Sequence, residues 1–140
     1  MAFTQQLTGM RGVYLVAAEL SRLGFIASPT SRSAIGADIL VTNQSCTQTY
    51  SVQVKTNART FNFWLLNKKS KEIASENHIY VFVNLRPNKA GEIVEYYIVP
   101  SKVVANKMIY EESPRAKWYS FPIKDALPYK NDWTLFGNAV

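Results

Sequence analysis

The chain has 140 residues, of which 47% are hydrophobic, and its formal net charge is +6. This length suits one domain with a single hydrophobic core, and the hydrophobic content excludes a disordered chain. Cys46 is the only cysteine, which excludes an internal disulfide and a cysteine-rich metal site. The apolar run at residues 13–20 contains Glu19 and is shorter than the roughly 20 residues of a membrane span, so we expect a cytoplasmic protein that does not contact a membrane.

The positive charge is concentrated in the first half of the chain. Residues 1–71 carry eight Lys or Arg against two Asp or Glu, whereas residues 72–140 carry eight of each. Such asymmetry favours a polyanionic partner, because basic side chains near phosphates release condensed counterions. A solvated surface that only keeps the protein soluble is the alternative.

Hydrophobic periodicity predicts a helix first and then mainly strands. The expected order is a helix at 12–23, a strand at 25–28, a β-hairpin from 38–42 and 49–56, a strand at 61–66, a short polar helix or loop at 68–76, a strand at 78–85, a turn at 86–91, a strand at 93–99 and a helix from 101 to about 109. The helix at 12–23 is apolar nearly all round, so we expect it to be largely buried.

This order predicts an α/β fold with a mixed central β-sheet flanked by helices. We expect residues 1–140 to form one domain, with its core at 9–109. Residues 110–140, which contain four Trp or Tyr side chains between 118 and 133, are expected to be an aromatic closing segment that packs back on this core.

The predicted hairpin carries the residues with the most chemical meaning. Gln53 and Lys55 lie two residues apart and therefore share one face of a strand, beside Asp38 at the start of the neighbouring strand. Carboxylate and amide oxygens are suitable ligands for Mg²⁺, and a lysine can orient or deprotonate a water and stabilise charge on a phosphate. The alternative is an ordinary strand pair with one polar face.

The first 40% of the chain resembles the PD-(D/E)XK nuclease superfamily, in particular its small Holliday-junction-resolvase-like branch. The resemblance rests on Leu20 followed by Gly24-Phe25, on Ser28-Pro29-Thr30-Ser31, on Gly36-Ala37-Asp38 and on Val52-Gln53-Val54-Lys55-Thr56. It implies a restriction-endonuclease-like core in which Asp38 and Gln53, with the Val54 carbonyl, bind Mg²⁺ or Mn²⁺, and Lys55 is the catalytic lysine. It also places Ser31 near the scissile phosphate.

Two positions depart from this pattern. Gln53 stands at the acidic (D/E) position and brings no charge, although its oxygen can still bind a metal. The glutamate that the resolvase-like pattern has in its first helix falls on Val13. Glu19 is a candidate replacement acid, but it lies on another face of the helix, and it is equally suited to pair with Arg22 three residues later.

Other residues are open to two interpretations. Arg32, Arg59, Lys68, Lys69 and Lys71 are candidates for phosphate contacts, and a solvated surface is the alternative. We interpret Phe61, Phe63 and Trp64 as core residues rather than as side chains that stack on bases. We interpret His78, the only histidine, as structural.

The leading hypothesis is a metal-dependent endonuclease that hydrolyses DNA phosphodiester bonds, with branched or structured DNA as a candidate substrate and a homodimer as a candidate assembly. The first alternative is a nuclease-fold module that has lost catalysis and binds nucleic acid or a protein, because Val13 and Gln53 remove two negative charges. The second is an accessory subunit that completes its site in a larger complex.

Overall fold

The computed structural model describes residues 2–31, 36–59 and 61–140. Its centre is a five-stranded sheet with the order β1 (Ile26–Pro29), β2 (Ile39–Thr42), β3 (Thr49–Asn57), β5 (His78–Asn88) and β6 (Gly91–Pro100). The β3–β5 pair is parallel and the other pairs are antiparallel, so the predicted mixed sheet is confirmed.

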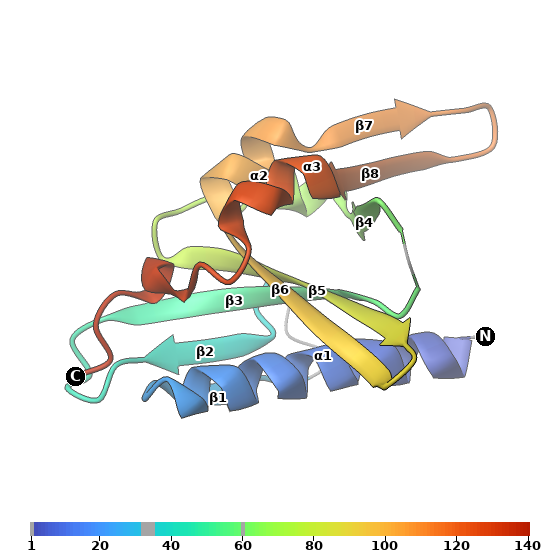
Figure 1. Ribbon diagram of the computed structural model, residues 1–140. Helices are drawn as coiled ribbons and strands as arrows, with labels where there is room; N and C mark the ends of the chain where they lie inside the picture. Colours follow the sequence, from blue (N-terminus) through green and yellow to red (C-terminus); the bar gives the residue numbers. More distant parts are fainter. Residues whose placement is uncertain (1, 32–35, 60) are drawn as a thin grey trace.

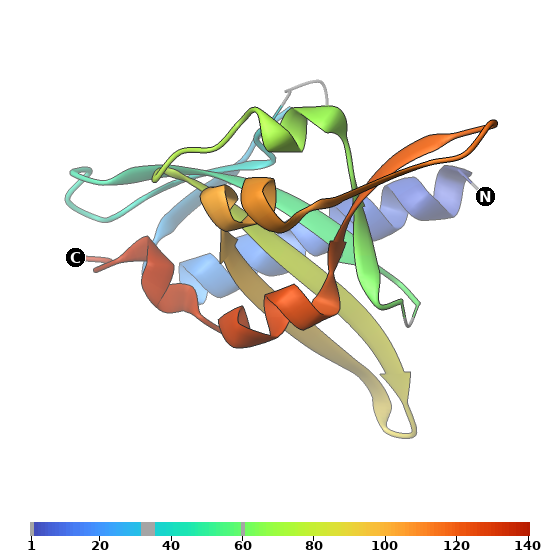
Figure 2. The same cartoon turned by 90° about the horizontal axis from the view of Figure 1, so that it is seen from above.

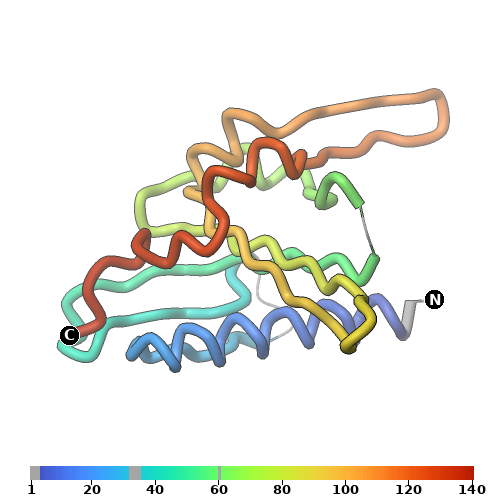
Figure 3. The backbone as a smooth tube through the Cα atoms, viewed as in Figure 1, coloured from blue at the N-terminus to red at the C-terminus, as the bar shows by residue number. Residues whose placement is uncertain are grey.

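Helix α1 (Ala2–Arg22) covers one face of this sheet, as Figures 1 and 3 show. Its side chains Val16 and Leu20 are fully buried and lie one helical turn apart, facing inward-pointing residues of β3 such as Val52. The opposite side of the helix is exposed, with Tyr14 58% accessible, so the helix is less buried than its apolar sequence predicted. One layer of strands can cover only one side of a helix. None of the helices in the described residues is long and apolar enough to cross a membrane.

Gly12 lies where α1 crosses β3 most closely. A Cβ at this position would lie 1.8 Å from the hydroxyl oxygen of Thr56, so no larger residue fits without a shift of the helix or the strand. The helix therefore passes over Thr56 at a distance that only glycine allows.

A second layer covers the other face of the sheet (Figures 1 and 2). It consists of a three-stranded sheet in the order β4 (Phe63–Leu66), β8 (Lys117–Pro122) and β7 (Ile109–Glu112), with α2 (Ser101–Lys107) and α3 (Ile123–Ala126). Trp64, Phe82 and Phe121 form the core between the layers, and Trp64 donates a hydrogen bond from its indole nitrogen to the carbonyl of Val83 at 3.0 Å. The remaining short elements are the 3₁₀ turns η1 (Lys68–Lys71), η2 (Leu127–Tyr129) and η3 (Trp133–Phe136).

Several predicted boundaries are wrong, for identifiable reasons. Helix α1 begins ten residues earlier than the predicted residue 12, because neither Gly9 nor Gly12 breaks it. The predicted turn at 86–91 is only two residues long, since Asn88 of β5 pairs with Gly91 of β6. Helix α2 ends at Lys107 because Ile109 begins β7.

The strand predicted at 61–66 is not part of the central sheet. It begins at Phe63 and pairs with β8, from the segment that the sequence suggested was only a closing tail. This pairing joins residues 53 to 59 positions apart, and the alternation of side chains within either strand does not specify it.

Candidate active site

Strand β3 has an open edge where its partner β2 begins. The β2–β3 register starts at Ile39 opposite Val52, and the backbone N–H of Asp38 donates to the Val52 carbonyl at 2.7 Å. Beyond Val52, β3 continues to Asn57 with β5 on its other side. The N–H and C=O of Val54 point to the same edge as those of Val52, because strand geometry repeats every two residues. This edge, and not the middle of the hairpin, positions the candidate site.

The side chain of Asp38 lies against this edge. Its Oδ2 accepts a hydrogen bond from the backbone N–H of Val54 at 2.8 Å and from the Gln53 amide at 3.0 Å. The carboxylate thus takes the place of the missing strand partner of Val54, and it holds Gln53 beside it. The sequence-based expectation that Asp38 and Gln53 meet is confirmed.

An open cleft of about 420 Å³ surrounds these groups. Its floor is formed by Asp38, Gln53, Val54, Lys55 and Thr56. One wall comes from the first half of α1 through Gln5, Gln6, Gly9, Met10, Val13 and Tyr14, and the other comes from Pro29, Thr30 and Ser31. The side chain of Thr30 donates to the Ala37 carbonyl at 2.6 Å and its N–H donates to the Asp38 carbonyl at 2.9 Å, which ties this wall to the carboxylate.

Burial shapes the electrostatics of the cleft. Desolvation raises the pKa of Asp38, although the Val54 N–H and the charge of Lys55 oppose the shift. Desolvation also lowers the pKa of Lys55, and the charge of Asp38 opposes that shift. Both charged forms are therefore poorly solvated by the protein alone. A cation beside Asp38 and an anion beside Lys55 would each relieve this cost.

Lys55 also faces a second, smaller recess on the other side of β3. This recess is lined by Gln53, Lys69, His78 and Tyr80 among others. His78 is 4% exposed and its Nδ1 lies 2.6 Å from the Ser51 hydroxyl, while burial lowers the pKa of its ring. Lys69 of η1 lines this recess together with Lys55, although the two residues are fourteen positions apart in the chain.

The oxygen atoms that could hold a cation are those of Asp38, the Val54 carbonyl and the Gln53 amide. In the present arrangement the Gln53 nitrogen faces Asp38, and rotation of the amide by half a turn would present its oxygen instead. Within residues 2–31, 36–59 and 61–140, no three His, Cys, Asp or Glu side chains cluster as metal ligands. This donor set fits one hard cation with a single protein charge, which implies weak binding.

The other residues proposed from the sequence divide into those inside and outside the cleft. Ser31 lines it. Val13, where the resembling pattern has a glutamate, also lines it, so that position faces the carboxylate site. Glu19 does not line the cleft. Its Oε2 accepts a hydrogen bond from Arg22 Nε at 2.8 Å, so Glu19 is not part of the candidate site. Arg32 lies outside the described residues.

The remaining basic candidates are spread over the surface. Lys68 and Lys71 are exposed on η1, together with Lys69, and Arg59 is exposed on the loop after β3. Of these described residues, Lys69 lines a recess together with Lys55.

Sequence reasoning did not identify the contribution of the N-terminal turns of α1. Gln5 and Gln6 line the cleft because the helix begins at Ala2. Gln6, Gly9 and Val13 follow a helical spacing that places them on one face of α1. This spacing could have predicted that the three residues line the cleft together.

Comparison of whole structures agrees with this arrangement. No protein-family model and no curated protein sequence matches the chain. Its structure is similar to that of Hjc from Archaeoglobus fulgidus, a Holliday junction resolvase from an archaeal hyperthermophile, with a TM-score of 0.53, 15% sequence identity and coverage of 87% of this chain and 88% of that chain. The chain has the restriction-endonuclease-like PD-(D/E)XK nuclease fold.

The structural similarity covers 87% of the chain, whereas the sequence resemblance reached only from about Gly9 to Thr56. Asp38, Gln53 and Lys55 therefore line a cleft in a chain whose overall fold is similar to that of a resolvase.

Proposed function

We propose that this protein is a metal-dependent endonuclease that hydrolyses phosphodiester bonds of DNA, with branched or structured DNA as its substrate class. The single observation that supports this most strongly is the open cleft at the β3 edge, where Asp38, Gln53 and Lys55 lie together in a nuclease fold. The structurally similar Hjc is a Holliday junction resolvase, and this likeness supports the choice of branched DNA.

Each residue of the cleft has a role in this proposal. Asp38, the Val54 carbonyl and the Gln53 oxygen would hold one Mg²⁺ or Mn²⁺. The bound ion would stabilise charge on the phosphate and lower the pKa of a water. The Lys55 amine lies at the floor of the cleft, where it would contact a phosphate oxygen or accept the proton of the attacking water, and its lowered pKa favours the second role.

DNA would lie across the basic first half of the chain. Lys69 lines a recess together with Lys55, and Ser31 lines the cleft wall, so both would contact the phosphates beside the cut. Arg32, Arg59, Lys68 and Lys71 would contribute sequence-independent backbone contacts. One chain holds one such cleft, so incision of two strands at a junction would require a homodimer.

The test is nicking of supercoiled plasmid and of a four-way junction in Mg²⁺ or Mn²⁺. Asp38→Ala and Lys55→Ala should each abolish cleavage while the circular dichroism spectrum stays that of the wild type. Glu19→Gln is the matched control, because Glu19 is an acid outside the cleft, and it should cut as the wild type does. Cleavage retained by both cleft variants would overturn the proposal.

A second candidate is a nucleic-acid-binding module that does not cut. The observation that favours it is Val13, which puts an aliphatic side chain on the cleft wall and leaves Asp38 as the only carboxylate among the lining residues. Calorimetric titration with Mn²⁺ separates the two functions. Heat of binding that disappears in Asp38→Ala supports the nuclease, and no binding at millimolar Mn²⁺ supports the module.

A further inference from the structure

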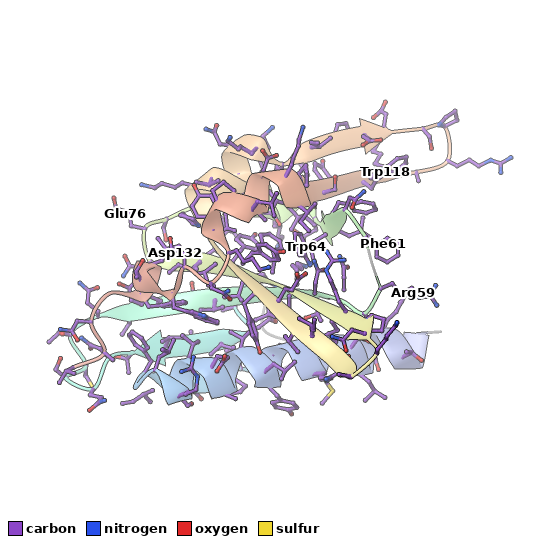
Figure 4. All side chains as sticks on the ribbon, in the orientation of Figure 1. Arg59, Phe61, Trp64, Glu76, Trp118 and Asp132 are labelled. Atoms are coloured by element: carbon purple, nitrogen blue, oxygen red, sulfur yellow. The ribbon has the colours of Figure 1, made fainter. Side chains whose placement is uncertain are left out.

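The outer face of the small sheet carries an apolar hollow that the cleft chemistry does not use. It is lined by Asn57, Phe61, Phe63, Leu65 and Trp118. The four apolar side chains are 36–59% exposed, although three of them are large aromatic rings. Our expectation that Phe61, Phe63 and Trp64 all belong to the core is wrong for the first two and right only for Trp64. Figure 4 shows Phe61 and Trp118 on the same side of the molecule.

The hollow lies farther along β3 than the candidate active cleft. Lys55 lines the cleft, and Asn57, two residues later on the same face of β3, lines the hollow. Since a strand rises about 3.3 Å per residue, the hollow begins roughly 7 Å beyond Lys55. A DNA strand with a phosphate at Lys55 would therefore carry its next one or two bases over the hollow.

The chemistry of the hollow suits a nucleobase. Phe61 and Phe63 lie with ring centroids 5.8 Å apart and an interplanar angle of 46°, and aromatic rings of this kind stack on bases irrespective of sequence. The Asn57 side chain lines the hollow, and its amide nitrogen donates to the Phe63 carbonyl at 2.8 Å. Its amide oxygen would accept a hydrogen bond from the edge of a base, which an aliphatic protein surface cannot offer.

The charged residues around the hollow indicate the path that a bound DNA strand would take. Arg59 is exposed on the loop that connects Asn57 to Phe61, and Figure 4 shows it beside Phe61. Glu111 lies opposite Trp118 on β7, on the other side of the hollow. Phosphates would therefore run along the Arg59 side, away from Glu111.

We propose that this hollow binds an unpaired base of the DNA strand that enters the cleft, so that the substrate is DNA with unpaired nucleotides next to the cut phosphate. The proposal rests on the proposed nuclease function for the identity of the cut phosphate, but base binding itself is independent of cleavage. Paired bases in a duplex cannot reach the hollow, because their faces are stacked within the helix.

The test is fluorescence anisotropy of a labelled single-stranded oligonucleotide and of the matched duplex, with the full chain in EDTA. Phe61→Leu and Phe63→Leu keep apolar bulk and remove the ring, so each should weaken single-strand binding roughly 5- to 150-fold and leave duplex binding unchanged. Phe63→Trp should bind the single strand at least as well as the wild type. Leu127→Ala, at an exposed apolar residue of η2, is the control and should change neither affinity.

Three outcomes would overturn the proposal. These are wild-type single-strand affinity in both leucine variants, equal losses on single strand and duplex, or a wild-type dimer in sedimentation that Phe63→Leu dissociates, which would make the hollow a contact between chains. The nicking assay is separate: if Asp38→Ala and Lys55→Ala both still cut while the leucine variants lose single-strand binding, the nuclease assignment fails and base binding stands.

Discussion

The carboxylate of Asp38 accepts a hydrogen bond from the backbone N–H of Val54 across the gap left by the end of β2. Asp38 therefore completes the hydrogen bonding of a strand edge, and it is also the only acid among the described residues that line the cleft. Structure and proposed chemistry compete at this position, because a buried carboxylate that is useful for binding a cation is costly without one.

Replacement of Asp38 separates these two roles. Burial raises the pKa of Asp38 in the folded chain. Asp38 therefore contributes its full stability below the ordinary pKa of 3.8, and this contribution is lost as the pH rises through the raised pKa. At neutral pH and without metal, we expect Asp38→Asn to be at least as stable as the wild type, since the amide oxygen still accepts from Val54. Asp38→Ala leaves that donor without its partner and should cost about 1–3 kcal/mol.

Urea unfolding in EDTA at neutral pH measures both changes. The pH series provides the control, because the advantage of Asp38→Asn should shrink toward pH 3 as the wild-type carboxyl takes up its proton. An asparagine variant that is much less stable than the wild type at neutral pH would contradict this account of burial.

Val13 is the position at which an added acid should strengthen the site. Its side chain lines the cleft beside Asp38 and Lys55, so Val13→Glu adds a second carboxylate where a shared cation would bind. We expect Mn²⁺ affinity to rise roughly tenfold or more, because carboxylate charge sets much of the affinity for hard cations. Calorimetry measures the change.

Val13→Gln is the control for size, and it should leave the affinity close to that of the wild type. Val13 also packs against the core, so both variants should unfold at lower urea without metal. Equal Mn²⁺ affinities in the two variants would show that the residue 13 side chain does not reach the cation.

Gly12 should be intolerant of even one added methyl group. Its Cβ would meet the Thr56 hydroxyl at 1.8 Å, so Gly12→Ala must push α1 away from β3, and we expect a loss of about 1–3 kcal/mol or more. Gly9 is in the same helix with nothing within 4 Å of its added Cβ. There the alanine should stabilise the chain by about 0.5–1 kcal/mol. Thermal or urea unfolding of the two variants measures both changes in stability. If both alanine substitutions stabilise the chain, or both destabilise it, the close crossing of α1 and β3 is refuted.

Glu95 should make the stability of the chain sensitive to acid. Burial raises its pKa, but hydrogen bonds and charges from Arg86 and Lys130 outweigh this and lower it overall. Glu95 therefore contributes to stability above the ordinary pKa of 4.5, and this contribution is lost as the pH falls through its lowered pKa. We expect Glu95→Gln to destabilise the chain by about 1–2 kcal/mol at neutral pH and by less below pH 4. Urea midpoints across pH 3–7 check this, and a constant difference across the range would contradict it.

The sequence predicted the candidate site well where local geometry decides. Gln53 and Lys55 share a face because strands repeat every two residues, and Asp38 meets them because a short hairpin leaves little freedom in register. The sequence alone left Glu19 open to the site or to Arg22 and favoured Arg22, and the structure pairs it with Arg22 outside the cleft.

The sequence by itself determined the mixed α/β character, the hairpin and the polar trio at its edge, because periodicity and turn chemistry act over a few residues. The tertiary structure decided what depends on distant contacts. It placed Gln5, Gln6 and Val13 along the cleft through the crossing of α1 over Thr56. It also paired β4 with β8, which buries Trp64 and leaves Phe61 and Phe63 exposed beside the cleft. No spacing within a single segment carries that information, since an apolar strand buries whichever face a distant partner covers.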